Sequence, residues 1–288
     1  MAVHLLSPHS MQNRRGLPRI PWSFVLLLLA LSLPFWVAAA RTRRSLAPGL
    51  PVSALMAVCP AIAAVLLSGW QGGAVAVRAL LREPLDYWKV QDPRWFVVAL
   101  ALKPAVMVVS YALMRWTGMT VPSPHLTIVL VAATFAVFFI AAVAEEIGWT
   151  AYLTDRMTRC SQMLPAAIAV GIVWAAWHLV PLSQANRSPV WIAWHALETV
   201  ASRVLIVWLY DSNQRCVFLA VLYHASDNVS WLLFPEWGSH YSPGITGPIS
   251  AAVAFAALAG PARAGLYSRQ PRSTSHPHSV TCPRKPFS

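Results

Sequence analysis

The sequence contains few charged residues and very few acidic ones. Only 11% of its 288 residues are charged, and 10 are aspartate or glutamate against 22 lysines and arginines. A soluble domain is usually about 25% charged, so a large soluble domain is excluded. The hydrophobic content of 57% excludes an intrinsically disordered chain. A formal net charge of +12 suggests nucleic-acid binding at first, but basic residues in short loops between apolar runs set membrane orientation instead.

Cysteine is also scarce. The four cysteines, Cys59, Cys160, Cys216 and Cys282, have neither paired metal-ligand spacing nor a dense disulfide framework. Cys282 lies too far from the C-terminus for a prenylation box. The sequence shows no internal repeat at solenoid or propeller periods. Cysteine chemistry and repeat architectures therefore contribute nothing to the expected function.

Long apolar runs are abundant. A membrane-spanning helix needs about 20 mainly apolar residues. The sequence predicts eight such helices, at residues 22–40, 51–70, 95–114, 126–149, 163–180, 190–210, 216–234 and 245–260. The proline in Lys103-Pro104 removes a backbone donor, which predicts a kink in the third helix. We expect an all-α, polytopic membrane protein in which about eight transmembrane helices surround a central polar cavity.

Composition divides the chain into three regions. Residues 1–49 form an N-terminal segment with the first transmembrane helix, residues 50–260 a membrane domain, and residues 261–288 a basic tail rich in proline and serine that we expect to be disordered. The first apolar run could instead be a signal peptide cleaved before Arg41, but a retained anchor is the favoured interpretation. Within the membrane domain, residues 71–94 mix apolar and charged side chains, which predicts a short interfacial helix followed by a loop.

Basic residues gather on one side of the predicted helices. The N-terminus, the loops 71–94, 154–162 and 211–215, and the tail hold most of the lysines and arginines. The positive-inside rule therefore places both termini in the cytoplasm. Compact loops with this charge pattern are typical of a prokaryotic plasma-membrane protein. We expect the lipid bilayer to surround the chain, and we expect no nucleic-acid partner.

Four of the acids lie inside apolar runs. They are Glu145, Glu146, Glu198 and Asp227. A charge at the centre of a spanning helix costs about 2.5–3.5 kcal/mol on insertion scales, so such residues indicate a functional site. Glu145 and Glu146 are adjacent, and two neighbouring carboxylates ionise together only at a cost, so one is expected to be protonated or paired. The alternative, that this pair only ends the fourth helix at the interface, stays open.

Two histidines lie on later predicted helices. His178 follows Trp174 with i, i+4 spacing, and His224 precedes Asn228 with the same spacing, so each pair shares a helix face. A buried histidine in a helical protein can serve packing alone, and a histidine–asparagine pair can serve as a hydrogen-bonding contact between helices. The residues by themselves do not choose between these interpretations and catalysis.

The spacing of these residues places them at one depth. Glu145 and His178 are equally far along the chain from a turn near residues 161–162, so on antiparallel neighbouring helices they reach the same level. At helical rise, Glu145 lies about 15 Å and His224 about 14 Å from the cytoplasmic boundary nearest to each in sequence. We therefore expect a carboxylate, two imidazoles and an amide to converge in one layer nearer the cytoplasmic face.

Such a set of groups suits several reactions. A carboxylate and a neutral imidazole can deprotonate water, and an imidazole and an amide can donate hydrogen bonds to an oxyanion, so together they suit hydrolysis of a peptide bond. Glu145, His178 and His224 are also normal zinc ligands, although no His-Glu-x-x-His helix is present. Proton or ion translocation uses intramembrane glutamate and histidine as well.

The motifs together resemble a known family. They are Glu145-Glu146 followed by Gly148-Trp149 and Tyr152-Leu153, then Trp174-x-x-Trp177-His178, then His224-x-x-x-Asn228. In this order they resemble the CPBP family, the CAAX proteases and bacteriocin-processing enzymes also called Abi proteins. The resemblance covers residues 50–235, and the core motifs span residues 145–228.

The resemblance implies an intramembrane endopeptidase that cleaves a membrane-associated protein or peptide. It implies that Glu145 activates water with help from His178, that His224 and Asn228 stabilise the oxyanion, and that Glu146 is a second, supporting acid. Whether such enzymes use a metal is disputed. No cofactor is therefore expected with certainty, and a divalent metal such as zinc, held by Glu145, His178 and His224, stays open.

The chain departs from the family pattern at one position. The family usually has Glu-Glu-x-x-x-Arg, whereas this chain has Thr150 where the arginine stands and Ala151 where a glycine follows. The usual ion pair of Glu146 within its own helix is therefore absent. Arg203 lies about 12 Å inside the sixth predicted helix, close to the same layer. We expect Arg203 to pair with Glu146 or Glu198.

Two other functions are compatible with these residues. The missing arginine supports a catalytically inactive membrane scaffold or immunity protein, and intramembrane acids also suit a proton- or ion-coupled transporter. For the protease, we expect Trp149, Thr150, Trp174 and Arg203 to support the catalytic residues. The substrate itself is not readable from the sequence.

Overall fold

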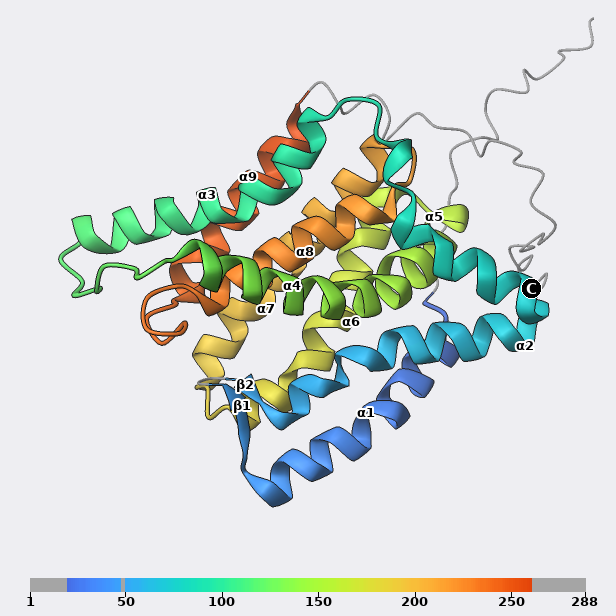
Figure 1. The fold of residues 1–288 in the computed structure, drawn as a ribbon, viewed down its shortest axis with the longest axis horizontal. Helices are drawn as coiled ribbons and strands as arrows, with labels where there is room; N and C mark the ends of the chain where they lie inside the picture. The colour runs from blue at the N-terminus through green and yellow to red at the C-terminus, as the bar shows by residue number, and fades with distance from the viewer. Residues whose placement is uncertain (1–19, 48–49, 261–288) are drawn as a thin grey trace, which may run out of the picture.

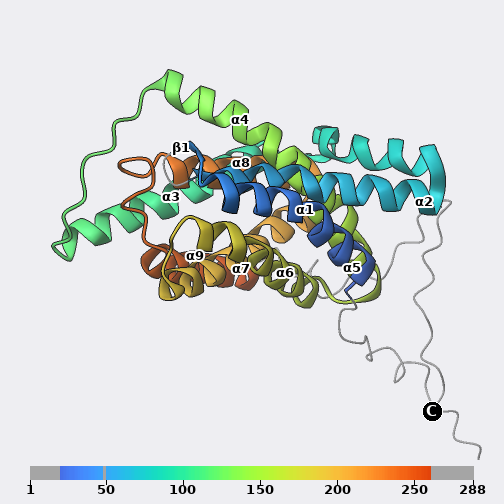
Figure 2. The same ribbon diagram turned by 90° about the horizontal axis from the view of Figure 1, so that it is seen from below.

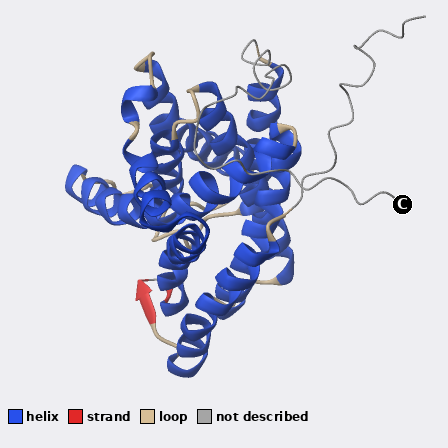
Figure 3. Cartoon of the chain, turned by 90° about the vertical axis from the view of Figure 1, so that its right-hand side faces the viewer, coloured by secondary structure: helices blue, strands red, loops and turns tan. Residues whose placement is uncertain are grey.

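The computed structural model describes residues 20–47 and 50–260, which are almost wholly helical (Figure 3). The main helices are α1 (Trp22–Thr42), α2 (Cys59–Arg82), α3 (Arg94–Trp116), α4 (Ile128–Glu146), α6 (Met163–Gln184), α7 (Pro189–Ser212), α8 (Val217–Leu232) and α9 (Pro243–Ala259). The shorter elements are β1 (Ser45–Ala47), β2 (Leu50–Pro51), η2 (Val52–Val58), η3 (Glu83–Leu85), η4 (Tyr87–Lys89), η5 (Ile147–Thr154) and α5 (Asp155–Cys160). The predicted disordered tail, residues 261–288, lies outside the described residues.

Each of the eight predicted apolar helices coincides with a main helix. Within the described residues, six helical segments are long and apolar enough to cross a membrane. The seventh and eighth predicted spans are shorter, since α8 has 16 residues and α9 has 17. The chain is therefore a polytopic, all-α membrane protein, as predicted.

The main helices are arranged around α8. Figure 2 shows α6, α7 and α9 together on one side and α1, α2 and α4 on the other. α8 packs against α3, α4 and α7, and α7 packs in turn against α6 and α9. Because two layers cover α8, most of its side chains are buried, including His224. The polar interior of the bundle lies along α7, α8 and the C-terminal end of α4.

The first helix belongs to the same bundle. Phe24 and Leu28 on α1 are fully buried, and the ring of Phe24 stacks on that of Tyr152 at 5.3 Å between centroids. Ser32 on α1 accepts a hydrogen bond of 2.8 Å from the indole of Trp177 on α6. α1 therefore packs directly on the elements that carry the sequence motifs.

One spanning segment, α2, leaves helical geometry in its middle. α3 continues through Pro104. In α2, however, Gly72 and Gly73 leave helical geometry, and Gly73 has φ of 63° and ψ of −159°. A side chain is strained at such a positive φ, so glycine is required there. The chain turns back at this point (Figure 1), and residues 74–89 form the helix, followed by short turns, that was predicted for 71–94.

The predicted loop 154–162 is wrong for most of its length. α4, η5 and α5 form one continuous helical rod from Ile128 to Cys160, and the turn is reduced to Ser161 and Gln162. The polar residues extend the helix here because they bond along it: Arg159 pairs with Asp155 at 2.8 Å. The turn still lies at residues 161–162, so Glu145 and His178 remain equally far from it.

The middle part of this rod, η5, is a π-helix of eight residues, all of them buried. A π-helix is wider than an α-helix and is commonly found at functional sites. Its close packing on α2 requires glycine at one position. A Cβ added to Gly148 would lie 2.4 Å from the Cβ of Pro60, so only glycine fits this contact.

Candidate active site

The adjacent glutamates end α4 immediately before the π-helix η5. The side chain of Glu146 is fully buried, and Glu145 is only 6% exposed. The helical rod continues past the pair to Cys160, so the pair does not end the fourth predicted helix. In η5, which follows the glutamates along the chain, the hydroxyl of Thr154 donates a hydrogen bond of 2.7 Å to the carbonyl of Trp149. This bond stabilises the wide turns of the π-helix.

Both carboxylate oxygens of Glu146 have hydrogen-bond partners. Arg203 of α7 donates to both carboxylate oxygens, at 2.8 Å and 3.0 Å, from its two terminal nitrogens. Thr150, one turn along, donates its hydroxyl to the same carboxylate. Nδ1 of His224 on α8 lies 2.7 Å from Glu146 Oε1. Because the guanidinium is also fully buried, the charge of Glu146 is neutralised inside the protein.

Glu145 has neutral partners. Its Oε2 accepts hydrogen bonds from two indole N–H groups, those of Trp149 at 3.3 Å and Trp174 at 3.2 Å. Its other oxygen, Oε1, lies 3.9 Å from Nε2 of His224. His224 therefore lies between the two carboxylates, in hydrogen-bond contact with Glu146 and beyond direct hydrogen-bond length from Glu145.

Trp174 joins the parts of this cluster. Besides the hydrogen bond from Trp174 to Glu145, the guanidinium of Arg203 lies over the face of the Trp174 ring, 4.2 Å from the ring centroid. The ring of His224 meets Trp174 edge-on at 5.1 Å. A cation over an indole face is attracted by the negative face of the ring. Trp174 thus positions Glu145, Arg203 and His224 relative to one another.

His178 and Asn228 lie at the edge of the cluster. His178 is half-buried, its Nδ1 is 2.9 Å from the carbonyl of Trp174, and its ring packs edge-on against Trp174 and Trp177. Asn228, one turn beyond His224, is also half-buried, and its amide has no hydrogen bond to any residue that the structure describes. Neither side chain bonds directly to a glutamate, so both keep hydrogen-bonding groups free.

The structure chooses between the two partners expected for Arg203. The guanidinium pairs with Glu146 and not with Glu198. The positive charge beside Glu146 comes from α7, and Thr150 contributes a hydroxyl 3.3 Å from Arg203 Nη1. The missing arginine is thus compensated across the helix interface.

Lys103 of α3 is a second buried cation, for which the sequence predicts no partner. Its ammonium pairs with Glu198 and, at 2.9 Å, with Asp227. Glu198 also accepts from the hydroxyl groups of Tyr241 and, at 2.9 Å, Thr246. These bonds join α3, α7, α8 and α9 into a second polar cluster. The sequence did contain a signal for this cluster: a lysine inside an apolar run and two acids, Glu198 and Asp227, inside other apolar runs.

The donor set does not fit a metal ion. No group of three histidine, cysteine, aspartate or glutamate side chains within the described residues is placed to hold one. Of the three ligands left open by the sequence, Glu145 Oε1 and His224 Nε2 lie 3.9 Å apart, whereas His178 packs on Trp174 and Trp177 and bonds to neither glutamate. The buried charge beside the glutamates is supplied by Arg203. We derive no catalytic step through a metal.

Fold and site together define a class: a polytopic helical membrane protein with a buried glutamate–histidine cluster. Residues 127–230 match the family model described as Type II CAAX prenyl endopeptidase Rce1-like. The chain is similar to CAAX prenyl protease 2 of Methanococcus maripaludis, with 27% identity over 115 residues. That alignment covers 37% of this chain and 39% of the relative, so the chain spans about two fifths of the relative's length. Both matches confirm the predicted resemblance to the CPBP family of intramembrane proteases.

Proposed function

We propose that the protein is an intramembrane endopeptidase that hydrolyses a peptide bond with water activated by Glu145. The observation that carries this assignment is the unequal environment of the two glutamates. Arg203, Thr150 and His224 occupy Glu146, which supports a structural, charge-holding role for it. Glu145 is held by neutral indole groups and faces His224 Nε2 at 3.9 Å, which leaves one carboxylate oxygen available for a proton.

In this mechanism a water molecule between Glu145 and His224 attacks the carbonyl carbon of the peptide bond. Glu145 takes a proton from the water as the new C–O bond forms, and the carbonyl oxygen becomes an oxyanion. Cleavage of the C–N bond then transfers the proton from Glu145 to the departing amine. The reaction consumes one water and releases a carboxylate and a protonated amine, which together carry both protons of the water.

His224 and Asn228 are proposed to stabilise the oxyanion, and His178 is proposed to help Glu145 activate the water. An imidazole N–H and an amide N–H are suitable donors, and such donors contribute strongly when they are pre-positioned in a site with little water. The half-buried position of His178 and Asn228 at the edge of the cluster supports these roles, since a substrate approaching Glu145 would meet them. The proposed substrate is a membrane-associated protein or peptide.

We further propose that the protein lies in a prokaryotic plasma membrane with both termini in the cytoplasm. Basic residues of the described chain gather at the end of the molecule formed by α5, the turn in α2 and the connection between α7 and α8, which supports this orientation. The packing of one face of α1, with Phe24 and Leu28, into the bundle supports its retention as an anchor. A reporter fused to the C-terminus, active only in the cytoplasm, tests the orientation.

The central experiment compares the membrane proteomes of cells that carry the wild type, Glu145→Gln or Glu236→Gln. The control, Glu236, is an exposed acid whose side chain is 63% accessible, in the connection after α8 and outside the three motifs. Peptide fragments that appear with the wild type and with the control, and disappear with Glu145→Gln, identify both activity and substrate. Identical fragments in all three strains would contradict the proposal, provided that the three proteins insert in equal amounts.

A further inference from the structure

The segment that follows the glycine break in α2 exposes apolar, aromatic and arginine side chains together. Residues 73–89, called the interfacial segment below, contain the second half of α2 with η3 and η4. Its exposed apolar and aromatic side chains are Val75, Leu81, Leu85, Tyr87 and Trp88. Arg78 and Arg82 are exposed on the same segment. Apolar side chains with arginines and aromatic rings alongside are typical of a helix at the boundary between lipid tails and headgroups.

The arginines of the interfacial segment are not neutralised by the protein. Arg78 and Arg82 form no ion pair with any residue that the structure describes. The two acids of the segment, Glu83 and Asp86, are both taken by Lys89, at 3.0 Å and 2.6 Å. The exposed guanidinium groups therefore have no protein carboxylate to pair with.

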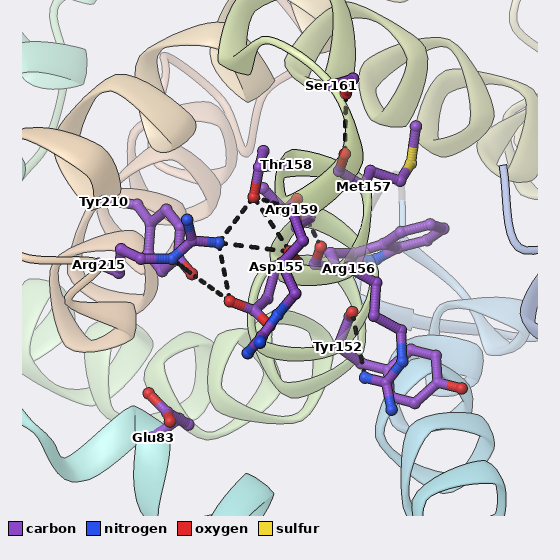
Figure 4. Close-up of polar contacts among 12 residues, drawn as sticks. Glu83, Tyr152, Asp155, Arg156, Met157, Thr158, Arg159, Ser161, Tyr210 and Arg215 are labelled. Carbon is purple, nitrogen blue, oxygen red and sulfur yellow. Dashed lines mark hydrogen bonds and ion pairs between the residues drawn. The ribbon is translucent and has the colours of Figure 1, made fainter. Parts of the chain in front are cut away.

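A third arginine lies against the same break. Nη2 of Arg156 on α5 donates a hydrogen bond of 2.9 Å to the amide oxygen of Gln71, the residue before Gly72. Its guanidinium also lies 3.5 Å above the ring of Tyr152. Figure 4 shows Arg156 and Tyr152 side by side next to the pale blue ribbon of α2. All of these partners are neutral, so Arg156 adds another positive charge there.

The neighbouring charges are already paired within the protein. Asp155 accepts from Arg159 at 2.8 Å and from Arg215 at 2.7 Å (Figure 4). Arg215 also donates to the hydroxyl of Thr158 at 2.7 Å. These bonds hold α5 against the turn between α7 and α8. Asp155 is therefore already paired with Arg159 and Arg215.

We propose that Arg78 and Arg82, one helical turn apart, bind the phosphate of an anionic phospholipid headgroup, while the exposed apolar side chains of the interfacial segment contact its acyl chains. Guanidinium groups match phosphate geometry with paired donors. A protein phosphate-binding site would not need the exposed apolar residues beside the arginines, so the combination favours a lipid over a free anion.

The test is a lipid titration of the purified full chain in a neutral detergent, with the thermal unfolding midpoint as the readout. Phosphatidylglycerol is expected to raise the midpoint at a lower mole fraction than phosphatidylcholine. Each arginine near an anionic surface contributes about fivefold to binding, so Arg78→Gln/Arg82→Gln should raise the half-saturating fraction of phosphatidylglycerol about 25-fold. Both side chains are exposed, so this variant should fold normally.

The matched control is Arg41→Gln/Arg44→Gln, which removes two exposed arginines near the β1–β2 hairpin, at the opposite end of α1 and α2. It should leave the titration unchanged. Equal effects of the two lipids, or equal losses in both double variants, would overturn the proposal. Inorganic phosphate alone is the third arm: if it reproduces the stabilisation by phosphatidylglycerol, the site binds a free anion and the lipid assignment is wrong. The readout does not depend on peptidase activity, so it stands apart from the proposed function.

Discussion

Replacing Arg203 by glutamine tests the central electrostatic feature of the site. Arg203 donates to Glu146 at 2.8 Å and 3.0 Å, and both side chains are fully buried. Removing one partner of a buried ion pair costs about 3–5 kcal/mol, because the remaining charge stays buried without compensation. About 1 kcal/mol lowers the unfolding midpoint of a chain of this size by about 2–4 °C. The variant should therefore unfold about 6–20 °C lower than the wild type.

A second variant separates the charge effect from loss of packing. Arg203→Gln/Glu146→Gln removes both charges, so no uncompensated carboxylate remains. Its loss of stability should be smaller than the sum of the two single variants, with a coupling energy of about 0.5–3 kcal/mol. Thermal unfolding of the wild type, both single variants and the double variant in one detergent gives this energy directly.

Arg187→Gln is the control for removing a partly buried arginine without a carboxylate partner. Its guanidinium lies 4.7 Å from the centroid of the Trp191 ring, and no ion pair is formed with a described residue. We expect a change within about 0.5 kcal/mol. The reasoning is refuted if Arg203→Gln is as stable as this control, or if the stability losses at positions 203 and 146 simply add.

Three further predictions concern packing, buried charge and pH. Gly148→Ala should lower the unfolding midpoint, because its Cβ would lie 2.4 Å from Pro60 Cβ, and such overpacking costs about 1–3 kcal/mol; an unchanged midpoint would contradict this tight contact. Lys103→Met should cost about 3–5 kcal/mol by leaving its two acidic partners unpaired, and changing both acids to amides in the same variant should recover part of the loss. Burial lowers the pKa of Lys89, but its bonds to Asp86 and the nearby glutamate outweigh this and raise the pKa above its ordinary value of 10.5. The stabilisation by the Lys89 ammonium is therefore complete below pH 10.5 and is lost as the pH rises through the raised pKa. In Lys89→Met the thermal unfolding midpoint should fall less steeply above pH 10.5 than in the wild type. Equal slopes of midpoint against pH in the two proteins would refute the pairing.

Much of the fold was predictable because apolar length is a local property of the chain. The eight apolar runs correspond to the eight main helices, and the glycine pair at residues 72 and 73 falls within the segment predicted to leave the membrane interior. The π-helix η5 was not predictable, since a widened helical turn depends on packing against α2 and has no simple composition. The helical course of Asp155–Cys160 was missed because its polar residues resemble a loop until their i, i+4 bond is seen.

The candidate site was partly predictable for a similar reason. Costly residues in apolar helices, such as Glu145 and His224, stand out by type and position alone. Their partners do not, because the pairing of Arg203 with Glu146 instead of Glu198 depends on the rotation of α7 about its axis. Lys103 was left without a role because nothing local connects it with an acid in another helix.

The sequence by itself determined the class of the protein, its spanning segments and the residue types available for catalysis. These follow from local hydropathy and from the cost of placing a charge in lipid, which are properties of short stretches of chain. Only the tertiary structure distinguished the two adjacent glutamates. Arg203 from α7 and Nδ1 of His224 from α8 neutralise Glu146, whereas indole groups from η5 and α6 hold Glu145 without a charge. Neighbours in sequence thus acquire different electrostatic environments because different helices reach them.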